Sequence, residues 1–173
     1  MTYQPELYIF GGLPAAGKST LAKNFAKKIG AVYLRIDSIE EAIMANTQFL
    51  GPEGYQAAYS LASDNLDNGL TVVADSVNPV ELTRDAWRQV ARDQGVPYHE
   101  IEVICSDKTE HRRRLVSRES QSRITRVLTW EDVINREYEP WIGCYVFDTA
   151  GKSSEENIQR FGEVFHTIKK AKT

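Results

Sequence analysis

The feature of the sequence that most constrains the fold is a glycine-rich stretch close to the N-terminus. An apolar run over residues 7–10 ends in two glycines, and residues 17–20 then read Gly-Lys-Ser-Thr at the start of a helix-forming segment. The spacing of four residues between Gly12 and Gly17 fits the phosphate-binding loop pattern, in the strand-to-helix context that this pattern requires. The stretch therefore predicts a binding site for a nucleoside triphosphate.

Each residue type in this loop has a physical role. Glycine carries no Cβ, so we expect positive φ angles at Gly12 and Gly17, which let the backbone wrap closely around a phosphate. The N–H groups of the loop and the positive end of the following helix would face that phosphate. Lys18 would reach the β- and γ-phosphates, and the Ser19 hydroxyl would bind Mg²⁺. The predicted nucleotide-binding residues are Gly12, Leu13, Pro14, Ala15, Ala16, Gly17, Lys18, Ser19 and Thr20.

Length and composition favour one cytoplasmic domain over residues 1–173. The chain has 173 residues, 42% of them hydrophobic and 26% charged, with a net charge of −3, so nothing global marks a nucleic-acid or membrane binder. No apolar run approaches the ~18 residues of a membrane span, and the first residues lack the pattern of a signal peptide. Cys105 and Cys144 lie in strand-like runs, which favours free thiols.

Hydrophobic patterning predicts strands that alternate with helices. The strands are expected over residues 6–10, 31–36, 70–74, 98–105 and 144–147. The helices are expected over about 18–29, 38–45, 55–68, 79–93, 108–118, 129–140 and from 154 onward, with Asn78 as an N-cap and a capping box at Ser153. This order predicts an α/β fold, a three-layer sandwich around a five-stranded parallel sheet.

Three aspartates are each the first carboxylate after a predicted strand, so all three are expected at the ligand-binding edge of the sheet. Asp37 is the candidate general base that orients an acceptor hydroxyl and takes its proton, although it could instead cap the next helix. Asp75 ends an apolar strand, and we expect it to hold Mg²⁺ through a water alongside Ser19; the alternative is a turn residue. Asp148 is interpreted as part of a strand-to-helix loop.

An arginine-rich segment follows the fourth strand. Arg114 and Arg118 are four residues apart and share one face of a predicted helix, and Arg123 lies in the polar linker beyond it. Mobile arginines can stabilise the charge that spreads over a transferring phosphoryl group, so residues 108–128 are interpreted as a lid. A solvated basic helix and a nucleic-acid patch are the competing interpretations.

With these motifs in place, the chain resembles the small P-loop kinases. This group includes "AAA family ATPase" kinases, polynucleotide 5′-kinases, chloramphenicol phosphotransferases, and the gluconate and shikimate kinases. The resemblance implies a core like that of the nucleoside monophosphate kinases, a helical lid and ATP·Mg²⁺ as the phosphate donor. It also implies Asp37 as the base and Arg114 near adenine, while Lys18, Arg118 and Arg123 approach the phosphates.

One position departs from the polynucleotide kinases, which usually carry an arginine three residues after the base. Here that position is Glu40, so the positive charge that would hold a nucleic-acid phosphate is missing. We therefore expect an ATP-dependent phosphotransferase that acts on a hydroxyl of a small molecule, as a monomer or dimer. The alternatives are a 5′-hydroxyl polynucleotide kinase and a nucleotide-gated binding module without acceptor chemistry.

Overall fold

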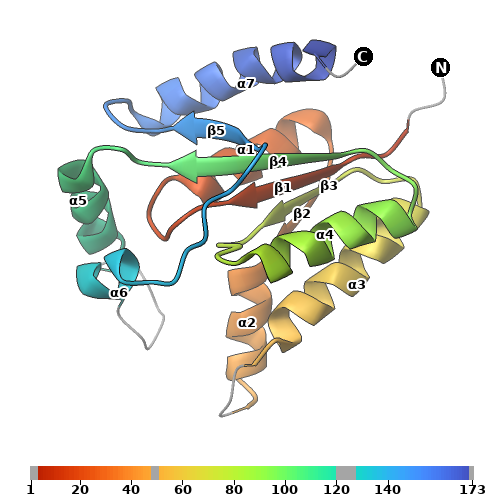
Figure 1. The fold of residues 1–173 in the computed structure, drawn as a ribbon, viewed down its shortest axis with the longest axis horizontal. Coiled ribbons are helices and arrows are strands. Elements are labelled where there is room, and N and C mark those ends of the chain that lie inside the picture. The colour runs from red at the N-terminus through yellow and green to blue at the C-terminus, as the bar shows by residue number, and fades with distance from the viewer. Residues whose placement is uncertain (1–3, 48–50, 120–127, 172–173) are drawn as a thin grey trace.

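The protein is built around one sheet of five parallel strands (Figure 1). The computed structural model describes residues 4–47, 51–119 and 128–171, of which 118, 119 and 166–171 are described by their backbone alone. The strand order is β2-β3-β1-β4-β5. The bounds are β1 (Leu7–Gly11), β2 (Val32–Arg35), β3 (Val72–Asp75), β4 (Tyr98–Ile104) and β5 (Tyr145–Asp148). The predicted α/β class and the five-stranded parallel sheet are confirmed.

Helices cover both faces of this sheet and complete the three layers. Helices α1 and α7 pack on one face, and α3 and α4 pack on the other (Figure 1). The helices are α1 (Lys18–Ile29), α2 (Ile36–Met44), α3 (Glu53–Asp67), α4 (Glu81–Asp93), α5 (Lys108–Glu119), α6 (Trp130–Ile134) and α7 (Ser154–Ala171). The helix expected over 129–140 is shorter than predicted, because it ends at Ile134.

The central strand β1 is buried on both faces, which its continuous apolar sequence requires. Tyr8 and Phe10 point into an aromatic cluster with α1 and α7, where Phe25 makes edge-on contacts with Tyr8 and with Phe161. Leu7 and Ile9, on the opposite face, pack against α3 and α4. This two-sided burial fixes β1 at the centre, and the loop that follows it therefore emerges at the middle of the sheet edge.

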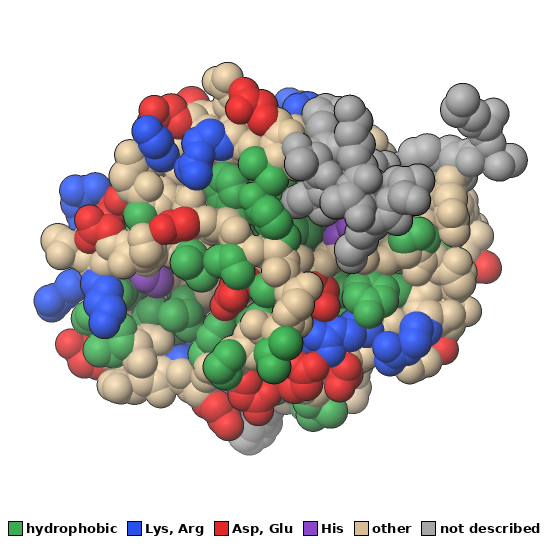
Figure 2. Space-filling model, turned by 45° about the horizontal axis from the view of Figure 1, so that its top comes forward, with side chains coloured by type: hydrophobic (Ala, Val, Ile, Leu, Met, Phe, Trp, Pro, Cys, Tyr) green, Lys and Arg blue, Asp and Glu red, His purple; other side chains and the backbone are tan. Residues whose placement is uncertain are grey.

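The surface carries mixed charge. On the face shown in Figure 2, lysine and arginine side chains lie among aspartate and glutamate side chains, with apolar side chains between them. This agrees with a net charge of −3 over the chain. Both cysteines are free thiols, as expected, with Cys105 buried and Cys144 half-buried.

The prediction that Asn78 caps the next helix is wrong. Helix α4 begins at Glu81 with Val80 at its N-cap, and Asn78 lies upstream with φ 49° and no exposed surface. Its side-chain amide donates to the Phe10 carbonyl at 3.1 Å, and its Oδ1 accepts from the Trp87 indole at 3.1 Å. Asn78 therefore joins β1 to α4 through the core, a contact that its local sequence pattern does not indicate.

Asn78 bonds within the core whereas Ser153 caps a helix, so their substitutions should destabilise the protein to different extents. Asn78→Ala should lower the free energy of unfolding by about 2–4 kcal/mol, because it leaves the Trp87 N–H without its partner and places alanine at positive φ. Ser153→Ala should cost about 1 kcal/mol, because Ser153 and Glu156 form the capping box expected at α7. Urea unfolding of both variants measures the two losses. Equal losses would mean that Asn78 acts only as a local cap.

Candidate active site

The loop between β1 and α1 has the backbone shape that its glycines predict. Gly12 has φ 140° and Gly17 has φ 95°, and Ala15 between them also takes a positive φ of 63°. A Cβ on Gly12 would lie 2.1 Å from the Val103 carbonyl oxygen, so this position accepts only glycine without rearrangement. Such a run of residues turns successive N–H groups toward one point, which makes an anion-binding concavity.

Two carbonyl groups of the loop are held by other parts of the chain. The ring of His111, on α5, donates from Nε2 to the Pro14 carbonyl at 2.7 Å, and the Thr149 hydroxyl, just after β5, donates to the Ala16 carbonyl at 2.8 Å. Both side chains are buried. Because these carbonyls already have partners outside the loop, the loop is held in its phosphate-binding shape by tertiary contacts as well as by its glycines.

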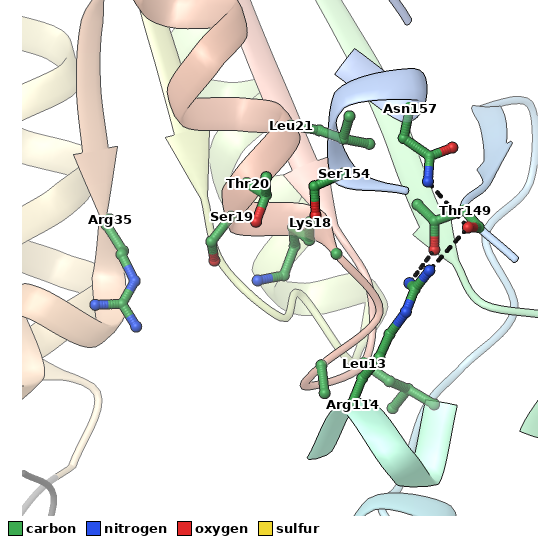
Figure 3. A pocket seen from close by; sticks show the side chains of 12 residues that line it. Leu13, Lys18, Ser19, Thr20, Leu21, Arg35, Arg114, Thr149, Ser154 and Asn157 are labelled. Carbon is green, nitrogen blue, oxygen red and sulfur yellow. Dashed lines mark hydrogen bonds between the residues drawn. The ribbon is translucent and has the colours of Figure 1, made fainter. Parts of the chain in front are cut away.

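A cavity of about 420 Å³ runs along this loop (Figure 3). The loop and the first turn of α1 supply Leu13, Ala15, Gly17, Lys18, Ser19 and Thr20. One end of the cavity is formed by Arg114, Thr149, Ser154 and Asn157, and the Arg35 side chain lies at the opposite end (Figure 3). Gly12, Pro14 and Ala16 shape the loop but do not line the cavity.

The Arg114 end of the cavity is a network of hydrogen bonds. The guanidinium of Arg114 donates to the Thr149 hydroxyl at 2.8 Å and to the Thr149 carbonyl at 3.0 Å, and it pairs with Glu110 at 2.6 Å. The Asn157 side-chain amide also donates to the Thr149 carbonyl, at 3.0 Å. Arg114 is thus immobilised beside Gly17, at the flank of the loop that faces β5 and α7.

Beneath the loop, Lys18 forms a buried ion pair with Asp75. The Lys18 ammonium lies 2.9 Å from Asp75 Oδ1, and the side chains are only 7% and 0% exposed. The Tyr33 hydroxyl, on β2, donates to the other carboxylate oxygen at 2.6 Å. Burial raises the pKa of the Asp75 carboxyl, but the Lys18 charge and hydrogen bonds from Tyr33, Lys18 and Ser19 outweigh it and hold the pKa below its usual value. Asp75 is therefore ionised at neutral pH.

Asp37 lies in the first turn of α2, and its interpretation as an N-cap is wrong because Arg35 occupies that position. The Asp37 carboxylate pairs with the Arg35 guanidinium at 2.7 Å and remains one-third exposed. Asp37 itself does not line the cavity, but its partner Arg35 does. One turn further on, burial and the Asp37 charge raise the pKa of the half-buried Glu40 carboxyl.

Four of the predicted site residues lie together around the loop: Lys18, Ser19, Asp75 and Arg114. The other predicted residues do not join this group among the described side chains. The Arg118 side chain and Arg123 lie outside the described residues, as does most of the segment that links them. Asp148 accepts hydrogen bonds from the Ser106 and Ala150 N–H groups, at 3.1 and 3.0 Å, and so organises the loop after β5.

Sequence reasoning missed the roles of Tyr33, Arg35, His111 and Thr149. The sequence did contain a signal for Tyr33 and Arg35. They are two residues apart, so they share one face of the strand, and they precede Asp37 by four and two residues. Their relevance depends on β2 lying beside β3, where Arg35 is in register with Asp75. His111 and Thr149 reach the loop from residues far along the chain and carry no local signal.

Fold and site together define a P-loop protein, and the comparisons identify its family. A family model described as an AAA domain matches residues 7–136, which is most of the chain, and the chain belongs to this family. A comparison with curated protein sequences finds no match.

Several solved structures share the whole fold, and those with assigned activities are small P-loop kinases. An APS kinase from Mycobacterium tuberculosis, in complex with AMPPNP and APS, is 20% identical with a TM-score of 0.70, covering 94% of this chain and 98% of that chain. A putative kinase from Chloroflexus aurantiacus is 19% identical with a TM-score of 0.72, covering 96% and 99%. A gluconokinase from Sinorhizobium meliloti is 14% identical with a TM-score of 0.62, covering 97% and 99%. The predicted resemblance to the small P-loop kinases is confirmed.

Among the described residues, no helix is both long enough and apolar enough to span a lipid bilayer.

The hydrogen bond from Tyr33 predicts a pH-dependent stability difference. Tyr33→Phe should lower the free energy of unfolding by about 1–2 kcal/mol at pH 7, because it removes a donor to a buried carboxylate. The bond lowers the pKa of Asp75, so its contribution is full above the ordinary carboxyl pKa of about 3.9 and is lost as the pH falls through the lowered value.

Urea unfolding of both proteins across this pH range measures the difference. Tyr145→Phe, on the edge strand β5, is the matched control and should change the stability little at any pH. A difference between Tyr33→Phe and the natural protein that persists unchanged in acid would contradict the assigned hydrogen bond.

Proposed function

We propose that the protein is an ATP-dependent phosphotransferase that moves the γ-phosphate to a hydroxyl group of a small molecule. The observation that carries this proposal is the buried Lys18–Asp75 pair beneath the loop, at a cavity that extends from Arg114 to Arg35 beside Asp37. This arrangement offers a nucleotide site on one side and a carboxylate on the other. The APS kinase of similar fold was solved with the ATP analogue AMPPNP, which supports ATP as the donor.

The nucleoside would lie at the Arg114 end of the cavity. Hydrogen bonds to Thr149 and Glu110 fix the Arg114 guanidinium at this end, and a planar guanidinium can stack on a purine ring. The triphosphate would then follow the loop N–H groups toward Lys18 and Ser19. On binding, the Lys18 ammonium would exchange part of its contact with Asp75 for phosphate oxygens.

Ser19 and Asp75 fit the role of Mg²⁺ holders. Ser19 follows Lys18 and lines the cavity with it, and its hydroxyl is close enough to the Asp75 carboxyl to help lower the pKa of that group. A hydroxyl and a carboxylate oxygen therefore lie near each other, and Mg²⁺ prefers such oxygen ligands. Among the described residues, no group of three or more His, Cys, Asp or Glu side chains could hold a metal by itself. The nucleotide would therefore supply further ligands, and the bound ion would neutralise charge on the phosphate oxygens.

Asp37 would act as the general base. As the acceptor oxygen forms a bond to the γ-phosphorus, the bond from that phosphorus to the bridging oxygen of ADP breaks, and Asp37 takes the hydroxyl proton. His111 and Arg114 fix the first part of the predicted lid, residues 108–128, against the loop. The part that carries Arg118 and Arg123 would then close over the phosphates and bring these arginines to the transferring group. In this proposal residues 1–173 act as one kinase domain.

The proposed acceptor side carries two carboxylates, Asp37 and Glu40, and the position of Glu40 supports a small molecule over a polynucleotide. Glu40 lies half-buried beside Asp37, where burial and the Asp37 charge raise the pKa of its carboxyl and the nearby Arg136 charge only partly opposes them. Polynucleotide binding is dominated by attraction between basic side chains and backbone phosphates. A carboxylate at this position would repel such a phosphate, whereas it can accept hydrogen bonds from hydroxyl groups.

The base assignment predicts a separation of binding from transfer. Asp37→Asn should lower the rate of phosphoryl transfer by about 10²–10⁴-fold, because the amide cannot take the proton, and should leave the Kd for ATP nearly unchanged. Acceptor-dependent ADP release and calorimetric titration with ATP measure the two quantities.

Asp64→Asn is the matched control, because Asp64 is an exposed aspartate of α3. It should leave both quantities unchanged. Transfer by Asp37→Asn at the natural rate would remove Asp37 from the reaction. Lost ATP binding in a folded Asp37→Asn protein would give Asp37 a role in nucleotide binding instead.

A further inference from the structure

We propose that Arg35 binds the γ-phosphate and stabilises the charge that develops on it during transfer. This inference rests on the proposed phosphotransferase function, and it assigns to the core sheet a catalytic arginine that the sequence pattern places in the lid. Four observations support it. They are the position of Arg35, the direction that the strand order gives to the cavity, the unused donors of the Arg35 guanidinium, and the pairing of Arg35 with Asp37.

Arg35 is the last residue of β2 and stands in register with Asp75 on the neighbouring strand β3. Its side chain lines the same cavity as Lys18 and Ser19, and Figure 3 shows its guanidinium on the far side of these two residues from Arg114. Arg35 thus reaches the site from a strand of the central sheet. Its place is set by strand pairing and needs no movement of a loop.

The order of the strands gives the cavity a direction. The loop leaves β1 at the centre of the sheet, Thr149 follows β5 on one side, and Arg35 ends β2 on the other side. With the nucleoside at the Arg114 end, the phosphate chain passes the loop toward β3 and β2. The terminal phosphate is the part of the nucleotide that comes nearest to Arg35, and the β-phosphate stays at the loop N–H groups.

The Arg35 guanidinium is oriented but has donors to spare. It donates to Asp37 at 2.7 Å and to the Ser38 hydroxyl at 3.2 Å, and Glu41 lies 3.9 Å away. A guanidinium has five N–H donors, so the contacts among the described residues leave some of them available for phosphate oxygens. The side chain is 22% exposed, so it is held in place while still reachable from the cavity.

The ion pair with Asp37 connects this arginine to the proposed base. One guanidinium that contacts both the Asp37 carboxylate and a γ-phosphate oxygen would hold the base next to the phosphorus that the acceptor attacks. Negative charge on the three equatorial oxygens needs nearby cations for stabilisation, and a planar, permanently charged fork suits this task. Arg35 would therefore stabilise the transferring group and also position Asp37.

Because the γ-phosphate alone distinguishes ATP from ADP, the inference is tested without knowledge of the acceptor. Calorimetric titration with Mg²⁺ and either AMPPNP or ADP compares the natural protein with Arg35→Gln. The variant should lose about 10–100-fold in affinity for AMPPNP and less than about threefold for ADP, because it removes charged hydrogen bonds to the γ-phosphate only.

Two further variants sharpen the comparison. Arg35→Lys keeps the charge without the fork and should show an intermediate loss for AMPPNP, with ADP again almost unaffected. Arg92→Gln is the matched control for lost charge, because Arg92 is exposed in the last turn of α4 and its guanidinium donates to the Gln89 side chain, with no carboxylate among its partners in the described part of the chain. It should bind both nucleotides as the natural protein does.

The outcomes separate the role of Arg35 from the proposed phosphotransferase function. An equal loss for both nucleotides in Arg35→Gln, or no loss for AMPPNP, overturns the role of Arg35 while the proposed function stands. Binding of neither nucleotide by the natural protein overturns the proposed function, and the inference with it. Should Arg35→Gln fail to fold by circular dichroism, the ratio of the two affinities in Arg35→Lys decides the question, and an unchanged ratio overturns the inference.

Discussion

The buried ion pair between Lys18 and Asp75 is the interaction on which the rest of the site depends. It joins the phosphate-binding loop to the end of β3, and the Tyr33 hydroxyl ties the same carboxylate to β2. Removing two charges from water is costly, and the hydrogen bonds around this pair offset that cost. The pair exists only because β3 lies directly beside β1. The strand order of the sheet therefore determines which carboxylate meets the lysine of the loop.

Charged groups at the two ends of the cavity extend this arrangement across the sheet. Arg114 is held by the loop after β5, and Arg35 ends β2, so the loop of β1 lies between two cations that come from opposite flanks. In the proposed binding mode, a triphosphate placed along the loop would pass Arg114, Lys18 and Arg35, which all line the cavity. Asp37 pairs with Arg35, and Glu40 lies near Asp37, so two carboxylates accompany the arginine at this end of the cavity.

The sequence predicts the parts of this site that are local and misses those that depend on tertiary contacts. The positive φ angles at Gly12 and Gly17 and the place of Asp75 at the end of β3 follow from short-range pattern, whereas the burial of Asp75 does not. The segment Asn-Pro-Val-Glu is a strong local signal for a cap at Asn78, yet the contacts of Asn78 with Trp87 and Phe10 determine its conformation. Tyr33 and Arg35 acquire their roles only from the pairing of β2 with β3, and alternation along the chain does not specify strand order.

The most direct test of the central claim is ADP release from ATP and Mg²⁺ in the presence of pooled hydroxyl-bearing compounds. The pools would contain sugars, aminoglycosides, chloramphenicol-like compounds, nucleosides and oligonucleotides with 5′-hydroxyl ends. A phosphotransferase predicts that a small-molecule pool raises ADP release well above the background in water, with phosphate appearing on the acceptor. Tight binding of ATP with no acceleration by any pool would contradict this account and favour a nucleotide-gated switch.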